Sequence, residues 1–218
     1  MIKKITRNLN SDEVIILGKL IKKSERELKS KNKNHYYPIA IVLGIGFVYL
    51  ASIISIQFLV FVFGTLAVIL FSFVIFTPYE LYKDRKRHKK NMLLANQYLA
   101  KKQIEVIPIR AKRIAIGKEY EDEGDLIIVE YDTNKILYLW DYDYNLKKKF
   151  PCLEFDIYED DFFKLIGKQV YPITEKIKPI IIKAKDKWNY FKKIGAPGHM
   201  ETINMDFDEL ILKYNNVA

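Results

Sequence analysis

The fold is decided by residues 36–79, which read YYPIAIVLGIGFVYLASIISIQFLVFVFGTLAVILFSFVIFTPY and carry no charged side chain. A bilayer core of about 30 Å is crossed by roughly 20 helical residues, at about 1.5 Å each. One helix of this length would reach about 66 Å, which is too long to fit by tilting. The stretch therefore predicts two membrane-spanning helices, near residues 37–54 and 58–77, with a turn at the polar residues Ser52, Ser55 and Gln57.

Two other interpretations of this stretch are less favoured. A soluble helical hairpin buried in a protein core would be expected to carry some charge on its outer faces. A cleaved signal peptide would be shorter and closer to the N-terminus. After the second span, Pro78 suits the first turn of a new helix, so residues 80–102 are expected to form a separate basic helix.

Charge flanks the apolar stretch on both sides. Residues 1–36 carry 10 Lys and Arg against 4 Asp and Glu, and residues 80–102 carry 8 against 2. The remaining residues, 103–218, carry 18 against 21, so the net charge of +9 does not predict a basic surface for DNA. Because both flanks are basic and the turn is not, the positive-inside rule predicts a multi-pass protein of the bacterial inner membrane with both termini in the cytoplasm.

The N-terminal residues 1–35 predict a basic amphipathic helix that begins at Ser11, with Asp12 and Glu13 in its first turn. Such a helix either lies on anionic lipid or packs on the protein's own cytosolic domain. Both arrangements remain open from the sequence alone.

From residue 103 the pattern changes to short apolar runs separated by turn residues, which predicts a cytosolic β-domain over residues 103–183. The runs 126–132 and 136–140 alternate and are joined by a short connection, so they are expected to form a hairpin. Residues 184–218 are a basic, aromatic segment followed by a short helix. The expected fold class is membrane α+β: a two-helix transmembrane hairpin over residues 36–79, then a small antiparallel β-barrel or sandwich with short helices.

The sequence contains no constellation typical of an enzyme. His35, His88 and His199 are far apart, and Cys152 is the single cysteine. No phosphate-binding, dinucleotide-binding or metalloprotease motif is present, so we predict no catalytic residue, no cofactor and no metal site. A membrane-bound hydrolase would require His199, Cys152 and one of Asp160 or Asp161 to converge in one cleft.

Two groups of residues are candidates for contacts with partners. Cations alternate with flat rings in one group, which suits a surface covering one end of the β-domain, a membrane interface, or a nucleotide ligand: Lys185, Lys187, Trp188, Tyr190, Lys192 and Lys193. Small residues recur in the other, which allows close helix packing within the hairpin or in a homo-oligomer: Ala40, Gly44, Gly46 and Gly64.

Three short motifs carry a resemblance: Glu121-Asp122-Glu123-Gly124, Leu137-Tyr138-Leu139-Trp140, and Phe150-Pro151-Cys152 followed by Phe155. Together they resemble a family of uncharacterised bacterial two-span membrane proteins with an EDEG turn and an FP[NC]xxF element. The resemblance covers roughly residues 105–160 and implies no activity. In layout alone, the chain also resembles membrane effectors of bacterial anti-phage systems.

We therefore expect an anchor in the lipid bilayer and a cytosolic β-domain that binds a ligand or protein partner, as a sensor or scaffold. The alternative is a nucleotide-gated effector, in which the β-domain senses a nucleotide and the hairpin oligomerises to disrupt the membrane.

Overall fold

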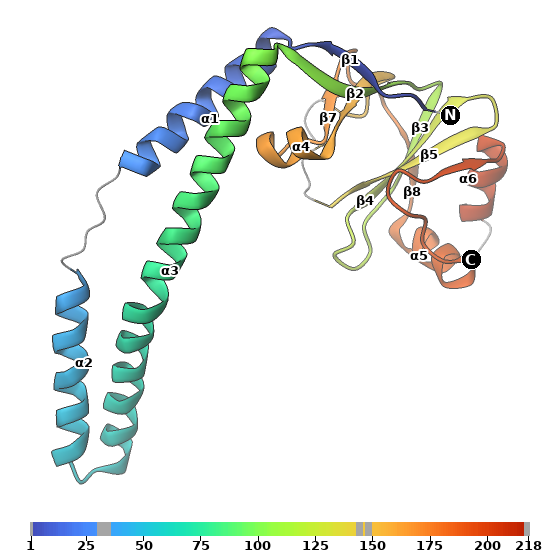
Figure 1. Cartoon of the computed structure of the whole chain (residues 1–218). Helices are drawn as coiled ribbons and strands as arrows, with labels where there is room; N and C mark the ends of the chain where they lie inside the picture. The colour runs from blue at the N-terminus through green and yellow to red at the C-terminus, as the bar shows by residue number, and fades with distance from the viewer. Residues whose placement is uncertain (1, 30–35, 143–145, 147–149, 216–218) are drawn as a thin grey trace. The chain divides into compact units, whose positions relative to one another are not determined.

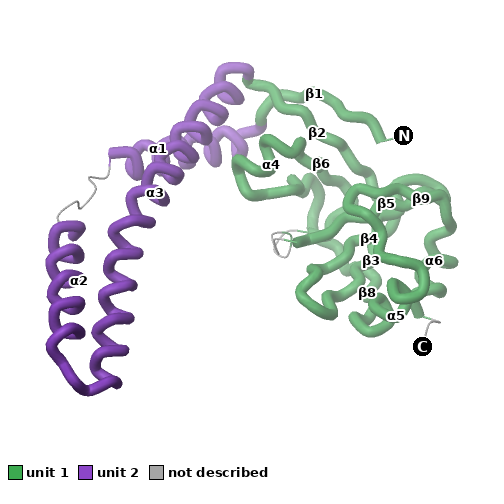
Figure 2. Tube along the Cα trace, turned by 60° about the horizontal axis from the view of Figure 1, so that its bottom comes forward, with its two compact units in different colours: residues 1–9, 102–218 green, residues 10–101 purple. Residues whose placement is uncertain are grey.

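The structure is a computed structural model that describes residues 2–29, 36–142, 146 and 150–215. The chain divides into a helical unit, Asn10–Lys101, and a β-domain formed by Met1–Leu9 together with Lys102–Ala218 (Figure 2). The first nine residues therefore belong with the C-terminal half of the chain. This corrects the prediction that residues 1–35 form one helical region.

Helix α1, Ser11–Lys29, begins where the sequence predicts, but its cap lies one residue earlier. The Asn10 side chain accepts the Glu13 backbone N–H at 2.9 Å, and the Glu13 carboxylate accepts the Asn10 N–H at 2.8 Å. This reciprocal pair is a capping box, which satisfies two backbone donors that the first helical turn leaves free. α1 packs along α3, and Leu17 of α1 and Ala95 of α3 are both fully buried (Figure 1).

Helices α2, Tyr36–Ile53, and α3, Gln57–Lys101, form the predicted hairpin. Its two arms are joined by the stacked rings of Tyr37 and Phe73, 6.0 Å apart, and of Phe47 and Phe63, 5.7 Å apart. Both helices are long and apolar enough to span a membrane.

Helix α3 differs from the prediction because it continues through Pro78 without a break. Its 45 residues correspond to a length of about 67 Å. Proline removes one backbone hydrogen bond from a helix interior. The run that follows Pro78 is rich in Lys, Arg, Glu and Leu, and adding such residues to an existing helix is favourable, so the helix continues.

The β-domain contains two sheets instead of a closed barrel. The first has the order β1-β2-β6-β7 and is antiparallel throughout: Ile5–Asn8, Gln103–Arg110, Glu154–Tyr158 and Val170–Pro172. The second has the order β8-β3-β4-β5-β9, and only its β3–β8 pair is parallel: Ile180–Ile182, Arg113–Gly117, Asp125–Asp132, Lys135–Asp141 and Thr202–Asn204. The predicted hairpin is confirmed as β4–β5.

Two apolar cores explain this layering. One lies between the sheets and includes Leu137 and Leu139 of β5 together with Phe155 of β6. The other lies on the opposite face of the five-stranded sheet, where Tyr138 and Trp140 pack with helices α5, Ala184–Ile194, and α6, Phe207–Asn215. Strand β5 is therefore buried on both faces, which accounts for its continuous run of large apolar residues. A short helix α4, Asp160–Ile166, follows β6.

The helical unit is inserted between two paired strands of the β-domain. Asn8, the last residue of β1, pairs with Gln103, the first residue of β2, and the Leu9 N–H donates to the Lys102 carbonyl at 3.0 Å. On the same strand, the Arg7 side chain reaches the Asp156 carboxylate of β6 at 2.7 Å. Chain entry into the helical unit and chain exit from it are thus held side by side by backbone hydrogen bonds.

Candidate functional site

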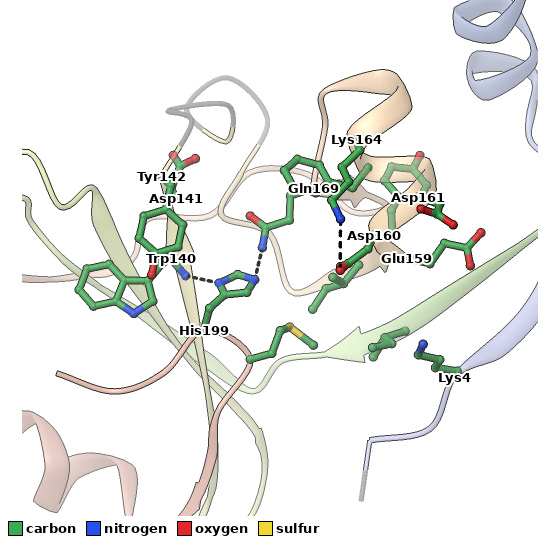
Figure 3. Close-up of a pocket in the computed structure, with 15 residues that line it drawn as sticks. Lys4, Trp140, Asp141, Tyr142, Glu159, Asp160, Asp161, Lys164, Gln169 and His199 are labelled. Atoms are coloured by element: carbon green, nitrogen blue, oxygen red, sulfur yellow. Dashed lines mark hydrogen bonds and ion pairs between the residues drawn. The ribbon is translucent and has the colours of Figure 1, made fainter. Parts of the chain in front are cut away.

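One hollow of the β-domain, here called the acidic pocket, has a volume of about 770 Å³ (Figure 3). Strands β2, β5 and β6, helix α4 and the segment that follows α5 contribute to its wall. Its ionisable lining comprises four carboxylates, two lysines and one imidazole: Asp141, Glu159, Asp160, Asp161, Lys4, Lys164 and His199. With the imidazole neutral, carboxylates outnumber ammonium groups two to one.

His199 is held in the pocket wall by two hydrogen bonds (Figure 3). The Trp140 backbone N–H donates to Nδ1 at 3.0 Å, and the side-chain amide of Gln169 lies 2.7 Å from Nε2. Because Nδ1 accepts the Trp140 N–H, the single proton of the neutral ring is assigned to Nε2, which faces the side-chain amide of Gln169. Burial lowers the pKa of His199, although the nearby Asp160 carboxylate acts in the opposite direction. The ring therefore serves as a neutral, oriented hydrogen-bonding group.

The carboxylates of the pocket come mainly from the start of α4. Glu159 is the N-cap residue, but its side chain makes no capping hydrogen bond. Asp160 and Asp161 lie in the first turn, where negative charge is favoured by the helix dipole. Asp160 is paired only loosely with Lys164, at 3.8 Å and in an exposed position.

The residues that a membrane-bound hydrolase would require are only partly brought together. His199, Asp160 and Asp161 line the acidic pocket, but Cys152 lies in the core between the two sheets. Its thiol donates to the Glu154 carbonyl at 3.2 Å, and burial raises the pKa of this thiol. A buried, protonated thiol is not a nucleophile. Among the described residues, no group of three or more His, Cys, Asp or Glu could hold a metal ion.

The predicted cation-and-ring segment falls on helix α5, and its six residues divide by burial. Lys185, Lys192 and Lys193 are exposed, and Trp188 is half-buried. Lys187 is fully buried and Tyr190 is 8% exposed. The structure therefore corrects the prediction for Lys187 and Tyr190, neither of which is available to a ligand or a lipid surface.

Lys187 instead fixes the Glu121–Gly124 turn. Its ammonium group lies 2.8 Å from the Glu123 carboxylate, which also accepts the backbone N–H groups of Tyr120 and Glu121. Burial alone would raise the pKa of Glu123, but the hydrogen bonds from Lys187 and the backbone outweigh it and lower that pKa to about 2. Gly124 follows with φ +83°, and a Cβ there would lie 2.7 Å from the Asp141 carbonyl oxygen. The EDEG turn is thus a structural element anchored to α5.

A second hollow of the β-domain, here called the aromatic pocket, has a volume of about 430 Å³. Trp140, Tyr142, Trp188, Phe191, Lys192 and Glu123 all line it, with Ala196 and Pro197. Trp140 and Tyr142 also line the acidic pocket, so one pair of rings borders both hollows. The sequence pattern indicated Trp188 and Lys192 as contact residues but not Trp140 and Tyr142. Strand register, and not local composition, brings these two rings beside α5.

The four small residues predicted at helix contacts occupy different environments. Ala40 and Gly44 are buried within the hairpin, and a Cβ on Gly44 would lie 3.1 Å from the ring of Phe71. Gly46 and Gly64 have open space where a Cβ would be. The first two therefore pack the hairpin, and the homo-oligomer remains a prediction.

Comparison with known proteins adds no relative. The chain matches no protein-family model, no curated protein and no solved structure. Its function must be argued from the pockets and the helices themselves.

Proposed function

We propose that the protein is a membrane-anchored binding module, in which the hairpin of α2 and α3 crosses the lipid bilayer and the β-domain binds a small ligand in the acidic pocket. The observation that carries the proposal is the pocket itself: about 770 Å³, with several polar groups converging on it. Such a hollow is the usual form of a ligand site.

The lining supports a ligand with a cationic group and hydrogen-bonding capacity. The lining carries four carboxylates and two lysines. An ammonium or guanidinium group is therefore attracted electrostatically to the pocket, and a phosphate is repelled. The exposed ring of Tyr142 offers a face for a cation, while the side-chain amide of Gln169, whose nitrogen contacts His199, offers its oxygen as an acceptor. The same charge balance disfavours a nucleotide in this pocket.

The strand connectivity supports a sensor role. Lys4 directly precedes β1, and Ile107 lies in β2; both line the acidic pocket. Strand β1 leads into α1, and α3 leads into β2. A ligand that tightens this wall acts on the strand pair that holds both ends of the helical unit.

The ligand is tested on the purified full-length chain in detergent. Agmatine and tyramine, which carry cationic groups, are expected to raise the melting temperature in a saturable manner. The double change Asp160→Asn, Asp161→Asn should abolish this shift, whereas Asp132→Asn, on the exposed β4–β5 turn, should leave it intact. No shift with either probe, or an equal shift in the double variant, overturns the proposed ligand class.

The membrane arrangement is tested by accessibility in intact bacterial cells, in a Cys152→Ala background. A membrane-impermeant maleimide should label Ser55→Cys, in the turn between the spans. It should label Lys193→Cys, on α5, only after lysis. Equal labelling of both positions contradicts the proposed topology, and release of the chain by alkaline carbonate contradicts membrane insertion.

A further inference from the structure

The aromatic pocket combines two stacked ring pairs with an exposed cation. The rings of Trp188 and Tyr120 lie 5.5 Å apart at an interplanar angle of 17°, and those of Trp140 and Tyr142 lie 5.8 Å apart at 12°. Trp140 is 4% exposed and Tyr142 is 59% exposed. Stacking covers one face of each ring, so Tyr142, the most exposed ring of the lining, has the most surface left for a ligand.

The charge of this pocket is opposite to that of the acidic pocket. Its one carboxylate, Glu123, is already neutralised by the buried ammonium group of Lys187 at 2.8 Å. The exposed ammonium group of Lys192 lies 5.4 Å from the ring centre of Trp188. Lys185 and Lys193 add two further exposed cations on the same helix. The ligand charge favoured here is negative.

We propose that the aromatic pocket binds a planar heteroaromatic compound that bears an anionic group, with a nucleoside monophosphate as the model ligand. The base stacks on the ring of Tyr142, and the phosphate is neutralised by Lys192, which lies over Trp188. Such stacking tolerates any base, because every base has a π-face. The site shares Trp140 and Tyr142 with the acidic pocket but takes a ligand of opposite charge, and it does not depend on the membrane anchor.

A proline-rich peptide, which also selects aromatic grooves, is less favoured. Peptides of this kind usually place a basic residue against acidic groups beside the rings. Here the carboxylate of the lining, Glu123, is paired with Lys187, and the other charged residue of the lining is Lys192. Charge complementarity therefore selects an anionic occupant.

The chain supplies its own reporter for this site. It contains two tryptophans, Trp140 and Trp188, and both line the aromatic pocket. Titration of the detergent-solubilised full-length chain with adenosine monophosphate should quench tryptophan fluorescence in a saturable manner. Adenosine should quench more weakly, and inorganic phosphate alone should not quench.

Two variants separate stacking from charge, and both retain the tryptophans. Tyr142→Ala should lower the affinity for adenosine monophosphate and for adenosine alike, by about tenfold. Lys192→Ala should lower the affinity for adenosine monophosphate about fivefold and leave the affinity for adenosine unchanged. Lys193→Ala is the matched control, because this lysine is exposed on the same helix but does not line the pocket.

Three results would overturn the proposal. One is the absence of quenching by both adenosine and adenosine monophosphate in the folded wild-type chain. Another is equal weakening by Lys192→Ala and Lys193→Ala, which would indicate diffuse attraction only. The third is quenching of the tryptophans by brominated lipids in nanodiscs, which would place these rings at a membrane surface. Because the acidic-pocket test uses cationic probes and melting temperature, its failure is distinguishable from failure here.

Discussion

The two units of the molecule distribute large and small side chains in opposite ways. In the helical unit the buried residues of the hairpin are small, such as Ala40, Gly44 and Ala67, while Phe58 and Phe61 are 72% and 73% exposed. In the β-domain the large rings are the buried ones: Phe155, Phe162 and Phe207 are fully buried. Burial from water can hold the β-domain together, whereas the hairpin leaves large rings exposed on helices that are long and apolar enough to span a membrane.

The largest test of this comparison removes the helical unit. Replacing Asn10–Lys101 by Asn-Gly, a favoured two-residue hairpin turn, would connect Leu9 directly to the residue it already pairs with, Lys102. We expect the shortened chain to stay soluble and monomeric without detergent, whereas the full chain requires it. Size-exclusion chromatography with light scattering measures both.

The control is the fragment 103–218, which lacks β1. Its loss exposes the edge of β2 and leaves the buried Asp156 carboxylate without Arg7, so we expect a markedly lower melting temperature and self-association. Aggregation of the turn-replaced chain would show that the β-domain, too, depends on the helices, and the contrast between the units would fail.

The next effect is expected at the EDEG turn. Gly124→Ala introduces a Cβ 2.7 Å from a backbone oxygen at a residue with φ +83°, so neither the conformation nor the space suits it. We expect a loss of about 3 kcal/mol of unfolding free energy, measured by denaturant titration followed by tryptophan fluorescence. Gly18→Ala, with open space in α1, should have no such effect on the β-domain.

Acid should weaken the same turn. The pKa of Glu123 is about 2 in the folded chain and ordinarily 4.5, so the stabilisation is complete above pH 4.5 and is lost as the pH falls toward 2. We expect a loss of roughly 2 kcal/mol over this interval, reduced from the full shift because the side chain is partly exposed. Glu123→Gln should remove this part of the pH dependence, and Glu121→Gln should retain it; equal profiles would contradict the anchor.

The smallest effect is expected in the hairpin, where two glycines form a matched pair. Gly44→Ala places a Cβ 3.1 Å from the Phe71 ring and should loosen the packing of α2 on α3 by about 1 kcal/mol, while Gly46→Ala meets open space. Cysteine cross-linking between the spans in membranes measures the difference. A larger effect at Gly46 would indicate a contact with another copy of the chain.

Features set by local pattern could be predicted from the sequence. The charge-free stretch implied the hairpin, and the alternation over residues 136–140 implied β5, because each signal lies within one element. The start of α1 at Ser11 was also predicted correctly. Pro78 was misjudged because the energy of the helix around it outweighs one missing hydrogen bond.

Features set by partners that are distant in the sequence could not be predicted from it. Strand β1 has four residues and is defined by pairing with residues 103–106, which no local pattern shows. Lys187 lies in a basic run, yet its burial depends on Glu123, more than sixty positions earlier. The acidic pocket joins residues from distant parts of the β-domain sequence, so the sequence suggested only Asp160, Asp161 and His199 of its lining as neighbours. Of the two predicted architectures, a barrel or a sandwich, the closed barrel was wrong, because two open sheets share a core without joining edges.

The pairing of β1 with β2 also sets an order of events during synthesis. Ile5 pairs with Val106, so β1 finds its neighbour only after the whole helical unit, Asn10–Lys101, has been synthesised. Both apolar helices are complete by then. The four-stranded sheet can therefore form only after both helices of the hairpin have been synthesised, and folding of the β-domain is completed last.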